Sequence, residues 1–312
     1  MSYKEILIQN TKYENVHEIT DEELKQLQMC MLECYKEINA VCEKHHIEIF
    51  LQGGSLLGAI RHKGFIPWDD DMDFGMSRKD YNKFIQIFDD ELGDRYIMSA
   101  PNSGHHAYNR FIQLFRKDTV LVNNFSDKNS DRPKCVYLDI FPIDYAPNNK
   151  VIRLLKGLYC NALMAVAGCV DMYSSKNTVI RKVMTRTRKG RMIYWMRMCI
   201  GRLFSFKAAE CWFDKVDRAV SSKHVTEYVT SATGRKHYLG EVVSADVFFP
   251  LSYARFEGTK IRVPNKPKAY LKNLYGDFMK IPPKKKRERH YITEISVIGI
   301  KKNECCRHDE YI

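Results

Sequence analysis

Apolar residues recur at helical spacing in several parts of the chain. The first such part follows residues 20–23 (Thr-Asp-Glu-Glu), which form a capping box, so we expect a helix from about residue 21 to residue 45. Its apolar face is expected to comprise Leu24, Leu27, Met31, Ile38 and Cys42. Ser77 and Asp80 predict the start of a second helix, and residues 267–275 predict a later one.

Short apolar runs between these helices predict strands. The runs are residues 47–51, 72–76, 110–122 (as two strands), 136–141 and 227–230, with a hairpin at 254–263. Gly53, Gly54 and Ser55 are expected to turn the chain from the first strand into a short helix over residues 56–61.

After Pro147 the sequence pattern changes from alternating strands and helices to helices alone. Residues 151–220 are expected to be helical throughout, and from residue 173 to 209 they include no acidic residue but ten lysines and arginines. We therefore divide the chain into three parts, residues 1–148, 149–222 and 223–312. The apolar run 158–170 is too short to span a bilayer, and Asn161 interrupts it.

The net charge and the cysteines indicate which partners and which cellular compartment to expect. The net charge of +12 indicates anionic partners, such as a nucleotide, a nucleic acid, a phosphorylated glycan or a membrane face. The ten cysteines form no CxxC pair and no zinc-like spacing, so we expect reduced thiols in a cytoplasmic protein. Residues 1–10 lack the pattern of a signal peptide.

Four aspartates lie within five residues, at Asp69, Asp70, Asp71 and Asp73. Carboxylates this close repel and raise each other's pKa unless a cation lies between them. In a strand, Asp69, Asp71 and Asp73 would share one face and Asp70 the other. Such a cluster of oxygen ligands suits Mg²⁺, with Mn²⁺ as an alternative.

The residues around this cluster predict metal-assisted phosphoryl transfer. A Gly-Gly-Ser turn before a helix suits phosphate, and Asp139 on a later strand adds a third carboxylate. A solvated acidic loop is the simpler interpretation, but apolar residues interleave with the acids. A calcium loop counted from Asp69 fails, because Phe74 occupies the position where glycine is obligatory.

Several blocks of the sequence resemble the LicD/fukutin-type phosphotransferase family. The longest is residues 53–73, GGSLLGAIRHKGFIPWDDDMD. The resemblance continues at 138–144 (LDIFPID), 256–258 (FEG), 263–264 (VP), 270–277 (YLKNLYGD) and 281–283 (IPP). Residues 151–220 lie outside the matched pattern.

The resemblance implies an α+β fold of the nucleotidyltransferase-like, polymerase-β type, with a mixed sheet core and a mainly helical insertion. It implies transfer of phosphocholine, or a similar phospho-alcohol, from a CDP-linked donor such as CDP-choline to a sugar hydroxyl, with release of CMP. The family's metal ligands correspond to Asp71, Asp73 and Asp139, which would also be catalytic. Its phosphate turn corresponds to Gly53, Gly54 and Ser55, and its basic residue at the helix end to Arg61.

Several other residues near the acidic cluster or after the last matched block each have two possible roles. Trp68 could stack on a base or enclose a quaternary ammonium, but core packing is the simpler reading. Asp69 could bind metal through water or pair with Arg61 or Lys63. The basic run of Lys284, Lys285, Lys286 and Arg287, with His290, departs from the mixed charges usual in the family and reads otherwise as a solvated turn.

Competing functions remain open at this point. An Asp-x-Asp metal site also serves nucleotidyltransferases and glycosyltransferases, and the basic charge alone would suit a non-enzymatic membrane-binding or nucleic-acid-binding module. We expect a cytoplasmic enzyme acting on a glycan acceptor, lipid-linked or not, for a cell-surface polymer such as lipopolysaccharide, teichoic acid or capsule. Nucleic acid is not expected as a partner. The basic helices predict peripheral contact with an anionic membrane at its inner face.

Overall fold

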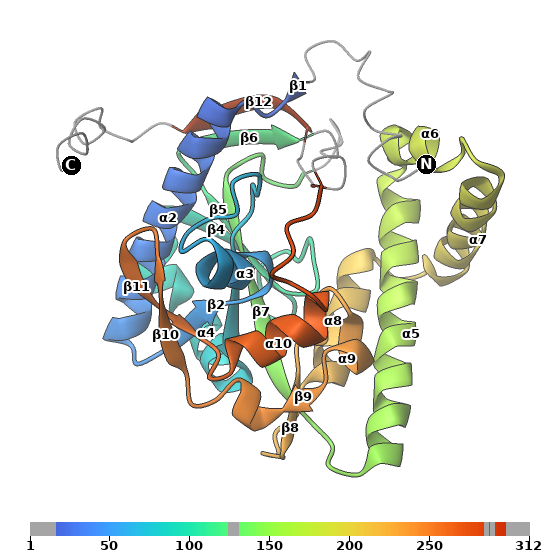
Figure 1. Ribbon diagram of the computed structural model, residues 1–312. Helices are drawn as coiled ribbons and strands as arrows, with labels where there is room; N and C mark the ends of the chain where they lie inside the picture. Colours follow the sequence, from blue (N-terminus) through green and yellow to red (C-terminus); the bar gives the residue numbers. More distant parts are fainter. Residues whose placement is uncertain (1–16, 124–130, 284–286, 288–290, 298–312) are drawn as a thin grey trace.

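The computed structural model describes residues 17–123, 131–283, 287 and 291–297 (Figure 1). Its centre is a mixed sheet in the order β2-β3-β7-β5-β4, in which β3 and β7 are parallel and the other neighbours are antiparallel. These strands are β2 (Ile49–Leu51), β3 (Asp73–Ser77), β7 (Tyr137–Ala146), β5 (Ile112–Arg116) and β4 (Tyr96–Ser99). The end of β7 pairs with β8 (Tyr228–Thr230), which pairs with β9 (Val243–Ser244).

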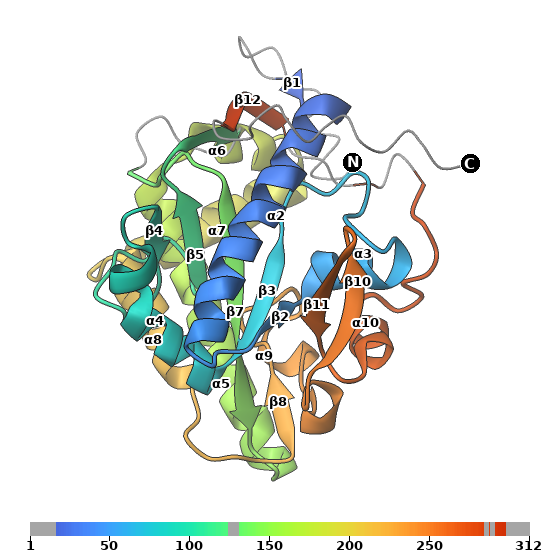
Figure 2. The same cartoon turned by 90° about the vertical axis from the view of Figure 1, so that its left-hand side faces the viewer.

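Helices cover both sides of this sheet. Figure 2 shows α2 (Asp21–Lys44) crossing one face, while α5 (Lys150–Ser175) and α8 (Ala209–Val220) lie beyond the other. The capping box predicted at Thr20 starts α2, and Tyr35 on this helix stacks on Phe74 of β3 with 5.1 Å between ring centroids. The side chain of Ser77 caps α4 (Arg78–Leu92), as predicted.

The remaining elements complete the fold around the first strands. A small sheet joins β1 (His17–Glu18), β12 (Tyr291–Val297) and β6 (Thr119–Asn123). The predicted hairpin is β10 (Ser252–Phe256) with β11 (Thr259–Val263), and the predicted later helix is α10 (Pro267–Tyr275). Two short helices are α9 (His237–Gly240) and a 3-10 turn at Ala245–Val247.

The α+β class with a mixed sheet is thus confirmed, and two local predictions are corrected. The glycine pair does not precede the short helix: α3 (Gly53–Arg61) starts at Gly53 itself, after Gln52. Strand β7 is longer than predicted and runs through Pro142 to Ala146.

The basic segment is helical, as predicted, and contains α5, α6 (Thr178–Met184), α7 (Arg188–Phe204) and α8. It leaves the sheet after β7 and returns at β8, and these two strands are hydrogen-bonded neighbours. Helices α5 and α8 share a second apolar core with α9. The boundaries of the three predicted parts stay a prediction.

Helix α5 differs from the expectation drawn from residues 158–170. It has 26 residues, and by length and composition it is long and apolar enough to cross a membrane. The prediction was too narrow because flanking residues such as Val151, Leu154 and Leu155 extend the apolar stretch.

A buried ion network ties the helical segment to the sheet. The guanidinium of Arg78 donates to both carboxylate oxygens of Asp144 on β7, at 2.8 and 2.7 Å, and to Asp217 on α8 at 2.7 Å. Asp144 is fully buried, and Arg78 is 8% exposed. The Asn102 side chain donates to the other oxygen of Asp217, so the acceptors of the network are well satisfied.

The cysteines of the described residues are free thiols, at Cys30, Cys34, Cys42, Cys135, Cys160, Cys169, Cys199 and Cys211. Within that part of the chain no disulfide joins two cysteines, and the reducing compartment stays a prediction. Cys305 and Cys306 lie outside the described residues, as do residues 1–10.

Candidate active site

The acidic cluster meets Asp139 at the start of two neighbouring strands. Asp73 is the first residue of β3 and lies directly beside Asp139 of β7 in the parallel register. Side chains at paired positions of a parallel ladder point to the same face of the sheet. Asp69, Asp70 and Asp71 precede the strand rather than form part of it, so the predicted alternation of faces applies only from Asp73 onward.

The electrostatics of this site are dominated by negative charge. Burial, followed by the charges of Asp71, Asp139 and Asp69, raises the pKa of Asp73 well above its usual value. A hydrogen bond from the backbone of Gly54 opposes that shift but does not cancel it. Burial also raises the pKa of Asp139 to about 7, and the charge of Asp71 adds to the rise. Both carboxyls would therefore be stabilised by a nearby cation.

A neutral amide fixes the orientation of Asp139. Gln113 on β5 donates from its Nε2 to Asp139 Oδ1 at 2.8 Å, and its own Oε1 accepts from Arg132 at 3.0 Å. Sequence reasoning missed both residues. The only available signal for Gln113 was a polar residue inside an apolar strand, which predicts a buried hydrogen bond but not its partner.

The glycine pair brings the start of α3 against the carboxylates. A Cβ atom at Gly54 would lie 2.9 Å from Asp69 Oδ2. Ser55 is buried, and its hydroxyl accepts a hydrogen bond of 2.8 Å from the backbone N–H of Asp73. Helix α3 is therefore joined directly to β3, and its positive N-terminal end faces the acidic cluster. Gly53 and Gly54 thus lie against the carboxylates of Asp73 and Asp69, whereas the buried hydroxyl of Ser55 is bound to the backbone of Asp73.

Gly53→Ala should lower both stability and any activity of this site. Gly53 has a φ of +55°, and a Cβ atom there would lie 2.6 Å from Asp73 Oδ2. We expect a loss of about 2 kcal/mol in the free energy of unfolding, from left-handed strain and the collision together. Gly104→Ala is the matched control, because Gly104 has a φ of +85° with no atom within 4 Å of the added Cβ. Equal losses in the two variants, measured by urea denaturation, would contradict the collision.

A cavity of about 300 Å³ opens next to the acidic cluster. Helix α3, the loop before β3 and the chain after α10 supply its walls. Its charged and aromatic lining residues are Arg61, Trp68, Asp69, Arg235, Tyr275, Asp277, Phe278, Lys280 and Arg287. Four cations beside a group of carboxylates suit a substrate with both phosphate and a divalent cation.

The structure places three of the residues singled out in the sequence, Arg61, Trp68 and Arg287, in the lining of this cavity. Arg61 donates to the carbonyl of Phe278 at 2.7 Å, and burial lowers its pKa while Asp69 raises it. Trp68 is only 9% exposed and packs in the core, while the Arg287 guanidinium lies 4.1 Å from its ring centroid. Lys284, Lys285, Lys286 and His290 lie outside the described residues.

Two further residues of the cavity were missed. Arg235 lies in the loop between β8 and α9, with its guanidinium 5.5 Å from the ring centroid of Tyr275. Burial, and then Asp73 and the neighbouring acids, raise the pKa of Tyr275. Tyr275 falls inside the matched block 270–277, which was its only signal. Arg235 had none, because its position depends on the tertiary fold.

The residues present fit Mg²⁺ in their chemistry. Within the described ranges, no three His, Cys, Asp or Glu side chains form a ready-made metal cage. Mg²⁺ is usually held by one or two carboxylates, with substrate phosphate and water completing its shell. Asp73 and Asp139, with Asp71 close enough to influence both, match that mode of binding.

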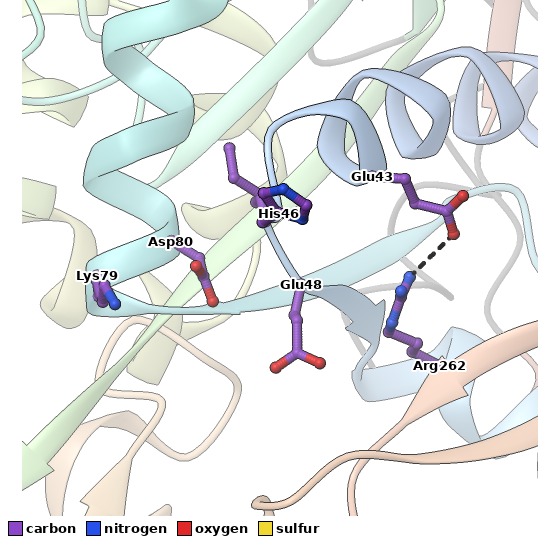
Figure 3. A pocket seen from close by; sticks show the side chains of 7 residues that line it. Glu43, His46, Glu48, Lys79, Asp80 and Arg262 are labelled. Atoms are coloured by element: carbon purple, nitrogen blue, oxygen red, sulfur yellow. Dashed lines mark hydrogen bonds and ion pairs between the residues drawn. The ribbon is translucent and has the colours of Figure 1, made fainter.

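A larger polar pocket lies at the opposite end of β3 and is a poor candidate for the same chemistry. It measures about 600 Å³ and is lined by Glu43, His46, Ile47, Glu48, Lys79, Asp80 and Arg262 (Figure 3). Glu43 and Arg262 form an ion pair at 3.4 Å. The lining carries three carboxylates but only two cations, one of them already paired, so it offers a phosphorylated substrate fewer positive groups than the cavity beside the acidic cluster.

Fold and site together define a class. An α+β fold with this mixed sheet is compatible with a nucleotidyltransferase-like protein, and its paired aspartates lie beside a helix N-terminus. Residues 46–155 match the nucleotidyltransferase domain of the LicD/FKTN/FKRP family. The resemblance seen in the sequence is therefore confirmed over this stretch of the chain.

Relatives extend the match beyond that domain. The lipopolysaccharide cholinephosphotransferase LicD of Haemophilus influenzae is 26% identical over 290 residues, which cover 88% of this chain and 98% of the relative. The ribitol 5-phosphate transferase FKRP of Homo sapiens is 38% identical over 68 residues, 20% of this chain and 14% of the relative. An uncharacterised protein of Rickettsia prowazekii is 32% identical over 142 residues, 42% of this chain and 47% of the relative.

Proposed function

We propose that this protein transfers a phospho-alcohol group, phosphocholine or a close analogue, from a CDP-linked donor to a sugar hydroxyl of a cell-surface glycan precursor. The observation that carries the proposal is the pairing of Asp73 with Asp139 beside the N-terminus of α3, next to a cavity lined by four cations. The similarity to two transferases of phospho-alcohol groups supports the same reaction class.

In the proposed reaction, the acceptor hydroxyl attacks the phosphorus that carries the alcohol. The bond between this phosphorus and the oxygen bridging the two phosphates breaks, and CMP leaves. Gly53 and Gly54 approach the donor phosphates closely, and Arg61 and Arg235 offset their charge. Asp139, held in place by Gln113 beside the proposed metal site, is positioned to accept the proton of the attacking hydroxyl. Mg²⁺ or Mn²⁺, when bound by Asp71, Asp73 and Asp139, would neutralise the transferring phosphate.

The proposed setting is the cytoplasm, at the inner face of the cell membrane, with a glycan acceptor that is lipid-linked. The free cysteines of the described residues support a reducing compartment. Neither the alcohol nor the glycan follows from the metal site, since choline, ethanolamine, ribitol and glycerol phosphates present the same oxygens to it.

The decisive experiment measures the leaving group. With Mg²⁺ and a panel of CDP-choline, CDP-ethanolamine, CDP-ribitol and CDP-glycerol, we expect CMP from at least one donor, and none in excess EDTA. Pyrophosphate from CTP, with no CMP from any CDP-linked donor, would instead indicate nucleotidyl transfer. A nucleoside diphosphate released from a sugar nucleotide would indicate glycosyl transfer. No product from any donor would favour a binding module.

A further inference from the structure

Helix α5 is longer than the helix that packs along one of its faces. It has 26 residues, whereas α7 has 17 and lies against the C-terminal half of α5, with Gly201 close to Cys169 and Tyr173. Figure 1 shows the lower half of α5 extending below α7 at the edge of the molecule.

The face covered by α7 continues, uncovered, into the N-terminal half. On a period of 3.6 residues, Leu155, Leu158 and Ala162 lie on the same side of the helix as Cys169 and Tyr173. Around this line α5 exposes six large apolar side chains, 50–65% accessible: Val151, Ile152, Leu154, Leu155, Leu158 and Tyr159. A contiguous exposed apolar patch of this kind usually marks an interaction surface.

Another face of α5 is already packed on protein. Gly157 lies against Leu239 and Tyr238, and Cys160 and Met164 belong to the buried core shared with α8. A helix held in this way presents only its free face to a partner. We therefore interpret α5 as a helix that lies on a surface, although its composition would allow it to cross a membrane.

The helix beside this face is cationic. Helix α7 exposes Arg188, Arg191 and Arg202 together with the apolar side chains of Met192, Trp195, Met196 and Leu203. The sequence has no acidic residue from 173 to 209 to offset these charges. Arginines interleaved with tryptophan and methionine are typical of helices at an anionic membrane interface.

We propose that the free face of α5 and the exposed side of α7 together bind the surface of an anionic lipid bilayer. A second copy of this chain is a less suitable occupant, because it would bring two basic α7 helices together in a protein of net charge +12. Anionic headgroups instead complement the arginines while the apolar side chains of α5 enter the interface. This surface lies outside the acidic site, so the proposal does not depend on the reaction.

Vesicle sedimentation tests the proposal with the full chain. We expect the protein to pellet with vesicles of phosphatidylglycerol and phosphatidylcholine, but not with phosphatidylcholine alone. Binding should weaken as salt rises from about 0.1 M to about 1 M, since the Debye length falls from about 10 Å to about 3 Å. Substituting Arg188, Arg191 and Arg202 with Gln should weaken binding about a hundredfold, and Leu155→Ser with Leu158→Ser about tenfold.

Control variants show whether a loss of vesicle binding is specific to this surface or follows from any loss of positive charge or of exposed apolar groups. Lys25, Lys36 and Lys268, all exposed, can be changed to Gln with the same loss of charge, and Tyr253→Ser removes an exposed apolar group from the β10–β11 hairpin. Both control variants should bind like the parent protein. Equal losses in test and control variants, or no pelleting at low salt, would overturn the proposal. So would a dimer in sedimentation equilibrium that only the α5 variant dissociates, with no vesicle binding.

Discussion

Asp73→Asn is expected to lower the rate of transfer at least about a thousandfold, equivalent to about 4 kcal/mol in the activation barrier. Asp73 lies beside Asp139 in the parallel ladder, and burial, together with three neighbouring carboxylates, raises its pKa. Removing its charge would weaken the attraction of the site for a divalent cation. Asp71→Asn should behave similarly. The measurement is CMP release at saturating donor and Mg²⁺.

Asp70→Asn is the matched control for this prediction. It removes the same charge from the same segment, but Asp70 is not among the groups that raise the pKa of Asp73 or Asp139. Its activity should stay close to that of the parent protein. Full activity of Asp73→Asn, or of the parent protein in excess EDTA, would contradict the metal site.

Burial of Asp139, with the charge of Asp71 beside it, predicts the behaviour of the protein without metal. The folded-state pKa of Asp139 is about 7, above the unfolded value of about 4, so folding favours its protonated form. Its contribution to stability is therefore present below about pH 4 and is lost as pH rises toward 7. Asp139→Asn should make the metal-free protein more stable at pH 8, by about 2 kcal/mol, with little gain at pH 4. Urea denaturation at both pH values measures the difference.

Arg78→Met should reduce the free energy of unfolding by about 4 kcal/mol. This change leaves the carboxylates of Asp144 and Asp217 buried without their cation, which costs far more than the loss of an exposed ion pair. Adding Asp144→Asn and Asp217→Asn to the same chain should restore part of the loss. Chemical denaturation of the single and triple variants provides the test.

The exposed ion pair of Lys44 and Glu91 provides a comparison for the buried network of Arg78. Lys44, 65% exposed in its side chain, pairs with Glu91 at 2.7 Å, and Lys44→Met should cost far less than Arg78→Met. A similar cost for Arg78→Met would show that the buried network is not needed to hold the helical segment on the sheet.

Local patterns predicted most elements because local physics determines them. The capping box at Thr20 and the proline that begins α10 act within a few residues, and both helices begin as predicted. Strand β7 was cut short at Phe141 because Pro142 and Asp144 interrupt its apolar pattern. The charge of Asp144 is compatible with a strand only because Arg78, 66 residues away in the sequence, pairs with it.

The sequence predicted the part of the site that lies in one continuous block, but not the residues that come from separate segments. The aspartates and the glycine pair lie in one continuous block, so their proximity follows from a strand, a turn and a helix. Gln113, Arg132 and Arg235 come from separate segments, and only the strand register and the loop after β8 bring them to the same place. Residue type alone did not distinguish them from other polar residues of the chain.

The pairing of β7 with β8 has a consequence for how this fold can vary. Asp144 lies opposite Thr230, and Ala146 opposite Tyr228, so the chain enters and leaves the helical segment at adjacent points. A tight hairpin can join two such antiparallel strands. The sheet that carries Asp73 and Asp139 therefore does not require the helices for its connectivity. A chain with a tight hairpin at this point would keep the order of its strands, but it would lose the ion pair of Arg78 with Asp217 and the apolar core that α5 shares with α8.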